Sequence, residues 1–189
     1  MTPVLTLLLR LSGAIDALNA RVGRAASSLV LVAVLISAGN ALIRYVFDAS
    51  SNAWLEVQWY LFSAVFLLCA GYTLLQGEHI RIDIVFDRLP PRTRAWVDIA
   101  GTVVFLLPVS LLLMVLSWPG LVESIVRGEV SGDAGGLVRW PARMLMPVGF
   151  LLLSLQGASE IIKRAAFLKG RIADPSGTRT APLPAGDRD

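Results

Sequence analysis

A long uncharged apolar run, from Val57 to Gly77, constrains the fold of this chain more than any other stretch. A helix rises about 1.5 Å per residue and the hydrocarbon core of a bilayer is about 30 Å thick, so about 20 apolar residues cross it. Aromatic and acidic residues precede the run, and a charged segment that begins at Glu78 follows it directly. The run is therefore predicted to be a membrane-spanning helix with both ends at the headgroups.

The composition extends this prediction to the whole chain. Of the 189 residues, 55% are hydrophobic and only 16% are charged, whereas soluble domains carry about 25% charged residues. The charged residues also lie between apolar blocks, which is typical of an integral membrane protein. The net charge of +3 does not indicate nucleic-acid binding, because the basic residues flank the apolar runs and form no stripe with interleaved aromatics.

Four apolar runs predict an all-α integral membrane protein with four transmembrane helices in one domain, residues 1–170. The predicted spans are residues 25–46, 54–77, 95–117 and 140–162. Short interfacial helices are expected in the loops. The tail, residues 171–189, carries prolines among Gly, Ser and Arg, and is predicted to be disordered.

Individual residues within the last two spans carry further expectations. Pro108 is expected to kink the third span, because a proline removes a helical hydrogen bond. The sequence Trp118-Pro119-Gly120 is expected to mark the exit of that span. Near the start of the fourth span, Arg143 is expected to extend its side chain outward to the headgroups.

The first 24 residues are predicted to form an amphipathic helix ahead of the first span. Their apolar side chains recur at spacings of three and four, at Val4, Leu8, Leu11, Ile15, Leu18 and Val22. Such a helix lies along the membrane surface or against a partner. A signal peptide fits less well, because no basic residue precedes the leucines and the first one is Arg10.

The basic residues predict the orientation of the chain in the membrane. Thirteen of the 17 basic residues lie before the first span, between the second and third spans, or after the fourth. Basic residues favour the cytoplasmic side of a membrane. Both termini, including the tail, are therefore predicted to lie in the cytoplasm.

The residues that could carry chemistry are few. A single cysteine, Cys69, and a single histidine, His79, argue against a zinc site or a two-histidine haem within the chain. A transporter that acts alone usually needs ionisable groups at membrane depth, whereas the main polar candidates inside the spans are Asn40, Gln58 and Gln156. The sequence therefore predicts no catalytic residue, no metal site, no substrate site and no cofactor, and favours a protein that holds another protein in the bilayer.

Two residues leave alternatives open. Glu56 either receives an arginine, from a partner subunit or from Arg44 across the short turn, or is a solvated carboxylate in the first helical turn, where the helix dipole favours it. His79 is either a proton-sensitive contact or a loop histidine bonded to the backbone. The five tryptophans all lie near predicted span ends, as in an aromatic belt.

A series of short motifs runs through the middle of the chain. It comprises Arg44-Tyr45-Val46-Phe47, Trp54 and Glu56, Gly71, Glu78-His79-Ile80-Arg81-Ile82-Asp83, and Leu89-Pro90 followed by Arg92. In this order and spacing the motifs resemble the small membrane subunit, the DctQ-like subunit, of the tripartite ATP-independent periplasmic (TRAP) transporters. The family usually has a second acid after the position of Glu56, where this chain has Val57.

The resemblance implies partners rather than a reaction. Such a subunit sits in the bacterial inner membrane, among membrane lipids, beside a large multi-span permease subunit that carries the substrate and sodium sites. A periplasmic binding protein delivers the solute, typically an organic acid, and the sodium gradient rather than ATP drives uptake. The small subunit resembles a fixed scaffold. The alternative is a structural subunit of another membrane complex, such as a respiratory enzyme.

The motifs also supply nine candidate residues for a partner interface or for ordering the loop between the second and third spans. They are Arg44, Trp54, Glu56, Gly71, His79, Arg81, Asp83, Pro90 and Arg92.

Overall fold

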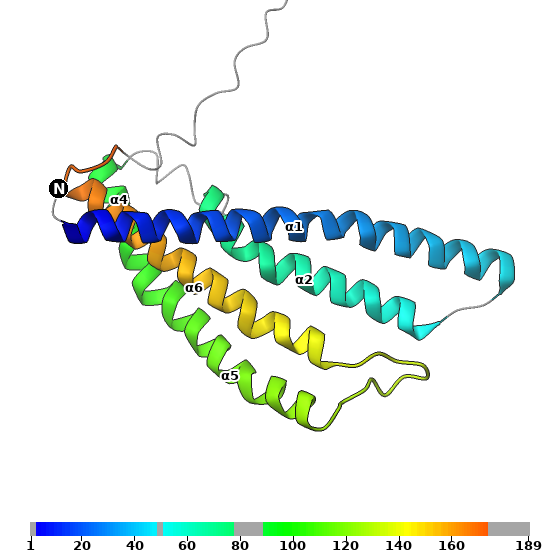
Figure 1. Ribbon diagram of the computed structural model, residues 1–189. Coiled ribbons are helices and arrows are strands. Elements are labelled where there is room, and N and C mark those ends of the chain that lie inside the picture. The colour runs from blue at the N-terminus through cyan, green and yellow to red at the C-terminus, as the bar shows by residue number, and fades with distance from the viewer. Residues whose placement is uncertain (1–2, 49–50, 78–88, 174–189) are drawn as a thin grey trace, which may run out of the picture.

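Long helices make up nearly all of the computed structural model, which describes residues 3–48, 51–77 and 89–173 (Figure 1). The helices are α1 Pro3–Phe47, α2 Asn52–Gln76, α4 Pro91–Gly101, α5 Leu107–Val126 and α6 Trp140–Leu168. One π-helical segment, Thr102–Leu106, joins α4 to α5, so that a single helix runs from Pro91 to Val126. This helix, α1, α2 and α6 are each long and apolar enough to cross a membrane. The predicted all-α membrane fold with four spanning helices is confirmed.

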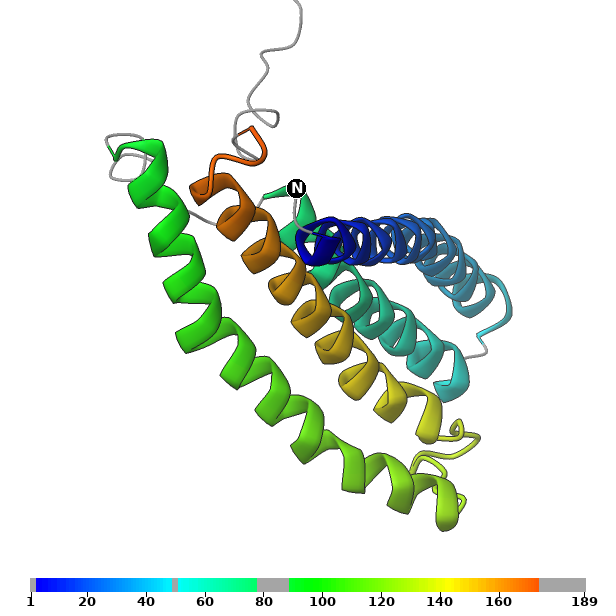
Figure 2. The same cartoon turned by 60° about the vertical axis from the view of Figure 1, so that its left-hand side comes forward.

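The α6 helix forms the centre of the bundle. It packs against α1, α2, α4 and α5, and Figure 2 shows α5, α6, α2 and α1 arranged as a fan. Glycines allow the close approach: a Cβ atom added at Gly149 would lie 2.8 Å from the carbonyl oxygen of Leu67 in α2, and one at Gly157 would lie 2.8 Å from Leu106 Cδ2. Small residues at such contacts are typical of helix packing in membranes.

The α1 helix is continuous over 45 residues, although the sequence predicts an amphipathic helix over residues 1–24 and a separate span after it. No proline follows Pro3 in this helix, and each internal glycine costs only about 1 kcal/mol relative to alanine. At about 1.5 Å per residue the helix is about 67 Å long, roughly twice the hydrocarbon thickness of a bilayer.

The first half of α1 turns its polar side inward. Leu8, Leu11 and Leu18 of the apolar stripe stay exposed, whereas Ser12 and Asn19 are buried against α6. In a lipid environment apolar side chains gain nothing from leaving the surface, while polar groups need partners inside the protein. The packing face is therefore the side without the large apolar residues.

Two prolines, Pro108 and Pro119, lie within the third spanning helix without ending it. Pro108 is the second residue of α5 and directly follows the π-helical segment Thr102–Leu106. A wider turn at that place accommodates the missing N–H and the bulky ring of the proline. The helix itself does not end at the predicted exit, since α5 continues past Pro119 to Val126. Spanning helices tolerate proline where the surroundings satisfy the freed carbonyl.

The connection between α5 and α6 folds back on itself. Val130 and Val138 form an isolated antiparallel bridge, and the Ser131 N–H donates to the Leu137 carbonyl at 2.9 Å. Gly135 adopts a φ of 74°, a left-handed conformation that glycine adopts without a Cβ clash. This connection, residues 127–139, is called the α5–α6 loop below.

Candidate functional site

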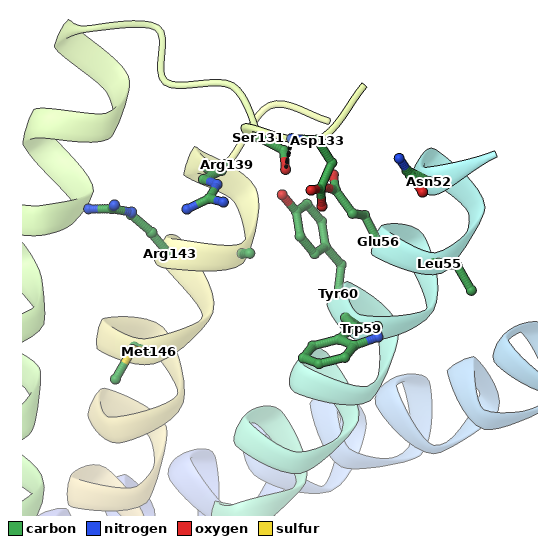
Figure 3. A pocket seen from close by; sticks show the side chains of 11 residues that line it. Asn52, Leu55, Glu56, Trp59, Tyr60, Ser131, Asp133, Arg139, Arg143 and Met146 are labelled. Carbon is green, nitrogen blue, oxygen red and sulfur yellow. Dashed lines mark hydrogen bonds between the residues drawn. The ribbon is translucent and has the colours of Figure 1, made fainter. Parts of the chain in front are cut away.

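An open cavity of about 580 Å³ lies between the start of α2, the α5–α6 loop and the start of α6. We call it the loop pocket. Figure 3 shows Glu56 and Tyr60 extending from α2 towards Ser131 and Asp133 of the loop, with Arg139 beside them. The lining thus combines aromatic and charged side chains at one end of the bundle.

One face of α2 holds the α5–α6 loop. Asn52, Glu56 and Tyr60 are spaced four residues apart, so that they lie above one another on the helix. Three hydrogen bonds join them to the loop: Asn52 Nδ2 donates to the Ala134 carbonyl at 3.3 Å, the Leu137 N–H donates to Glu56 Oε2 at 2.7 Å, and the Tyr60 hydroxyl donates to the Val138 carbonyl at 3.2 Å. Glu56 therefore fastens the loop, which neither interpretation from the sequence anticipates.

Glu129 connects the same loop to α5 and α6. Its Oε1 accepts a hydrogen bond from Arg143 Nη2 at 2.8 Å and lies 3.7 Å from Arg139 Nη1. Arg143 also donates from Nη1 to the Gly120 carbonyl of α5 at 3.0 Å. Arg143 thus has a carboxylate and a carbonyl oxygen of the protein as partners, and its expected extension towards the headgroups stays a prediction.

Replacing Glu56 with alanine is expected to speed hydrogen exchange at the Leu137 amide several-fold. The substitution removes the charged acceptor of that N–H, and charge-assisted hydrogen bonds are the stronger ones. Glu56→Gln should have a smaller effect, because its amide retains a carbonyl oxygen. Exchange measured by mass spectrometry on peptides from residues 130–139 checks this. The matched control is Glu123→Ala, whose exposed carboxylate pairs within α5 with Arg127 and with no other basic residue that the structure describes. Equal rates in Glu56→Ala and wild type would contradict the role of Glu56.

A second set of polar side chains lies at the other end of the bundle and joins α1 to α6. We call it the α1–α6 cluster, and its members are Ser12, Asp16, Asn19, Gln156, Ser159 and Lys163. Asp16 Oδ1 accepts hydrogen bonds from Gln156 Nε2 at 2.8 Å and from Ser159 Oγ at 2.7 Å, and Asp16 Oδ2 lies 3.0 Å from Lys163 Nζ. The carboxylate thus organises the contact between the two helices.

Hydrogen bonds between neutral side chains complete the α1–α6 cluster. The Ser12 and Ser159 hydroxyls are 2.7 Å apart, and Asn19 Nδ2 donates to Gln156 Oε1 at 2.9 Å. All four of these residues are buried. Each of the four side chains bonds across the contact, although the Asn19 Oδ1 atom accepts no hydrogen bond among the described residues. Because a buried polar group without a partner is costly, these hydrogen bonds make the contact specific as well as stable.

The same stretch of α6 carries two further ion pairs. Arg164 Nη1 lies 2.6 Å from Asp98 Oδ2 of α4, and both side chains are largely buried. Lys163 Nζ lies 2.6 Å from Glu160 Oε1 one turn away. The end of α6 is therefore held by charge to α1 on one side and to α4 on the other.

The nine residues suggested by the motifs do not form one site. Arg44, Trp54 and Glu56 lie at the end of the bundle that holds the loop pocket. Gly71, Pro90 and Arg92 lie along the chain towards the other end, with Pro90 and Arg92 exposed at the start of α4. His79, Arg81 and Asp83 lie outside the residues that the structure describes. Among the described residues, Glu56 makes no ion pair with Arg44.

Gly71 has a clear packing role. A Cβ atom added there would lie 2.3 Å from Asn19 Oδ1 and 3.2 Å from the Leu152 carbonyl oxygen. Only a glycine fits where α2 crosses both α1 and α6, because any larger residue would displace Asn19 from the α1–α6 cluster. Gly71 therefore acts on the interior of the bundle.

Sequence reasoning missed most of the residues that hold the structure together. Gln156 was among the polar candidates, but its partners on α1 were not. A signal was present: Ser12, Asp16, Asn19 and Gly23 follow one another at spacings of four, three and four, as one helical face does. The spacing of Asn52, Glu56 and Tyr60 is a second such signal.

In the described part of the chain, no three His, Cys, Asp or Glu side chains gather where they could hold a metal ion. Comparison with protein-family models matches residues 33–167 to the DctQ component of the tripartite ATP-independent periplasmic transporters. The match covers more than two thirds of the 189 residues. Neither the curated proteins nor the solved structures include a match to the chain.

Proposed function

The chain belongs to the DctQ component family of the tripartite ATP-independent periplasmic transporters, and from this membership we propose that it is the scaffold subunit of a sodium-coupled uptake system. Its partners are a large multi-span permease subunit, which carries the transport sites, and a periplasmic binding protein that delivers a small organic solute of the organic-acid class. The chain itself catalyses no reaction and binds neither a cofactor nor nucleic acid.

The use of buried polar groups supports a scaffold role. Ser12, Asn19, Gln156 and Ser159 are buried and bond to one another across the α1–α6 contact. Farther along the bundle, the Ser154 hydroxyl donates to the Ser110 hydroxyl at 2.8 Å, joining α6 to α5. Side chains that bond to one another across helix contacts hold the helices in place, as a stationary support for a moving partner requires.

The orientation follows from the basic residues. We place both termini, and with them the α1–α6 cluster, on the cytoplasmic side of the inner membrane. The loop pocket and the α5–α6 loop then lie on the periplasmic side, where a binding protein arrives. Labelling of single cysteines by a reagent that does not cross the membrane checks this arrangement: a cysteine at Ser131 should react in intact spheroplasts, and one at Lys169 should not.

Co-purification tests the proposed function directly. Tagged chain extracted from native membranes in mild detergent is expected to retain a large multi-span protein. Liposomes that contain both proteins should take up the solute when the binding protein and an inward sodium gradient are supplied, whereas liposomes with this chain alone should show no flux. Solute flux through the lone chain, or extraction without any large partner, would refute the scaffold role.

The charged segment after α2 is expected to matter for assembly. We predict that Arg81→Ala or Asp83→Ala lowers uptake by the reconstituted system, because both residues belong to the motif shared with the family. Arg127→Ala is the control, since the Arg127 side chain is 74% exposed and, within the described part of the chain, pairs only with Glu123. Uptake at the wild-type rate in both variants would show that Arg81 and Asp83 are not needed for transport.

A further inference from the structure

A polar notch opens between α1 and α2 close to the segment that connects them. Ser37, Asn40 and Arg44 of α1 and Gln58 of α2 line an open cavity of about 600 Å³ there. We call these four residues the polar notch. They lie at the end of the bundle where the chain passes from α1 to α2, on the right in Figure 1.

The four side chains of the polar notch have no partners among the described residues. No hydrogen bond or ion pair joins any of its four side chains to that part of the protein. Other polar side chains on the spanning helices bond to the backbone of their own helix, as Ser27 does to the Arg24 carbonyl at 2.9 Å and Thr73 to the Cys69 carbonyl at 3.0 Å. The notch therefore presents its hydrogen-bonding groups outward.

The depth of the notch makes this exposure costly. Ser37 lies ten residues before the end of α1, or about 15 Å along the helix, and Arg44 lies about 10 Å closer to that end. Tyr45 and Trp54 are exposed near the helix ends, and we expect them at the headgroup level because Tyr and Trp are enriched there. Ser37 and Asn40 accordingly lie below the headgroups, where lipid tails offer no hydrogen bonds and an unsatisfied polar group costs several kcal/mol.

We propose that the polar notch receives a transmembrane helix of the large permease subunit, and that this helix carries an aspartate or glutamate facing Arg44 and Asn40. This inference rests on the proposed function. The notch is rich in donors, because a guanidinium has five N–H groups and two side-chain amides add more, so its complement is an acceptor. Asp48 also lines the cavity but forms no ion pair with Arg44 among the described residues.

A helix fits the notch better than a phospholipid does. A lipid phosphate stays at headgroup level and reaches Arg44, but the acyl chains below it leave Asn40 and Ser37 without partners. A helix that runs along α1 passes Arg44, Asn40 and Ser37 in turn and can place a partner at the depth of each. Ser37 and Ala41 are small and one turn apart, which permits a second helix to approach closely.

Photocross-linking in the assembled complex tests the position of this helix. A benzophenone amino acid at Ala41 is expected to cross-link to the large subunit, in membranes that contain the co-expressed complex. Leu35 is the control position, since it points to the opposite side of α1 and its side chain is 63% exposed. Cross-links from Ala41 only to lipid, or only to a second copy of this chain, would overturn the proposal, as would stronger cross-linking from Leu35.

Substitutions test the chemistry of the same contact. Arg44→Gln and Asn40→Leu are each expected to lower the amount of co-purified large subunit about tenfold or more, as loss of one partner of a desolvated polar contact does. Their melting temperatures without the large subunit should equal that of the wild type, because the notch has no partners in the described part of the chain. Arg127→Gln is the control. Undiminished co-purification in both notch variants would refute the inference but leave the proposed function standing; wild-type chain that retains no large subunit would refute the function itself.

Discussion

Gly149→Ala is expected to lower the melting temperature of the purified protein by about 5 °C or more. The added Cβ would lie 2.8 Å from both the Cβ and the carbonyl oxygen of Leu67. The carbonyl belongs to the α2 backbone and cannot rotate away, so α2 and α6 must separate. Overpacking of this kind costs about 1–3 kcal/mol.

Gly39→Ala is the matched control for this substitution. A Cβ atom added at Gly39 meets nothing within 4 Å, and alanine is favoured over glycine within a helix by about 1 kcal/mol. The melting temperature of Gly39→Ala should therefore equal or slightly exceed that of the wild type. Thermal unfolding in detergent, followed by circular dichroism, compares the three proteins. A Gly149→Ala protein as stable as Gly39→Ala would contradict the close contact between α2 and α6.

Asp16→Ala is expected to destabilise the protein by about 2 kcal/mol or more. The substitution removes the carboxylate that pairs with the largely buried Lys163 and accepts hydrogen bonds from Gln156 and Ser159. The Lys163 side chain is 14% exposed and that of Asp16 is 25% exposed, so solvent compensates only in part. The first half of α1 should then come away from α6, and trypsin should cleave faster at Arg10. Cleavage is read from a time course on gels, alongside the melting temperature.

A double-mutant cycle separates this ion pair from general effects of substitution. Asp16→Asn and Lys163→Met should each lower stability, and the double variant should lose less than the sum of the two, because contacting residues couple. Glu123→Ala serves as the control for loss of a surface carboxylate, since its side chain is 54% exposed. Strict additivity in the cycle would show that Asp16 and Lys163 do not stabilise one another.

The helical architecture was predictable because lipid imposes a simple rule on the chain. Charges are costly in hydrocarbon, so each uncharged apolar run of sufficient length indicates a spanning helix. The ends of the helices were less predictable. Pro119 reads as a terminator by the rules for soluble helices, yet α5 continues past it to Val126. The continuity of α1 was also not predicted. The composition changes near residue 25, which suggested two helices, but this change does not interrupt the helical backbone.

The contacts of the candidate site were harder to predict, for two physical reasons. Glu56 and the Leu137 amide are 81 residues apart in the chain, so only the fold brings them together. In soluble proteins the apolar face of a helix packs inward, but in α1 the buried side carries Ser12 and Asn19. A search for polar and small residues at helical spacing would have found that face, and the same search on α2 would have found the residues that hold the loop.

The central place of α6 has a consequence for biogenesis. Translation adds about 5–20 residues per second, and the helices that precede α6 emerge from the ribosome before it. Until α6 inserts, Asp16 lacks Lys163 and Asp98 lacks Arg164, although α1 and α2 can already pair. A nascent chain stalled before Trp140 would thus lack the α6 partners of both aspartates, and the insertion of α6 is the step that completes the two ion pairs.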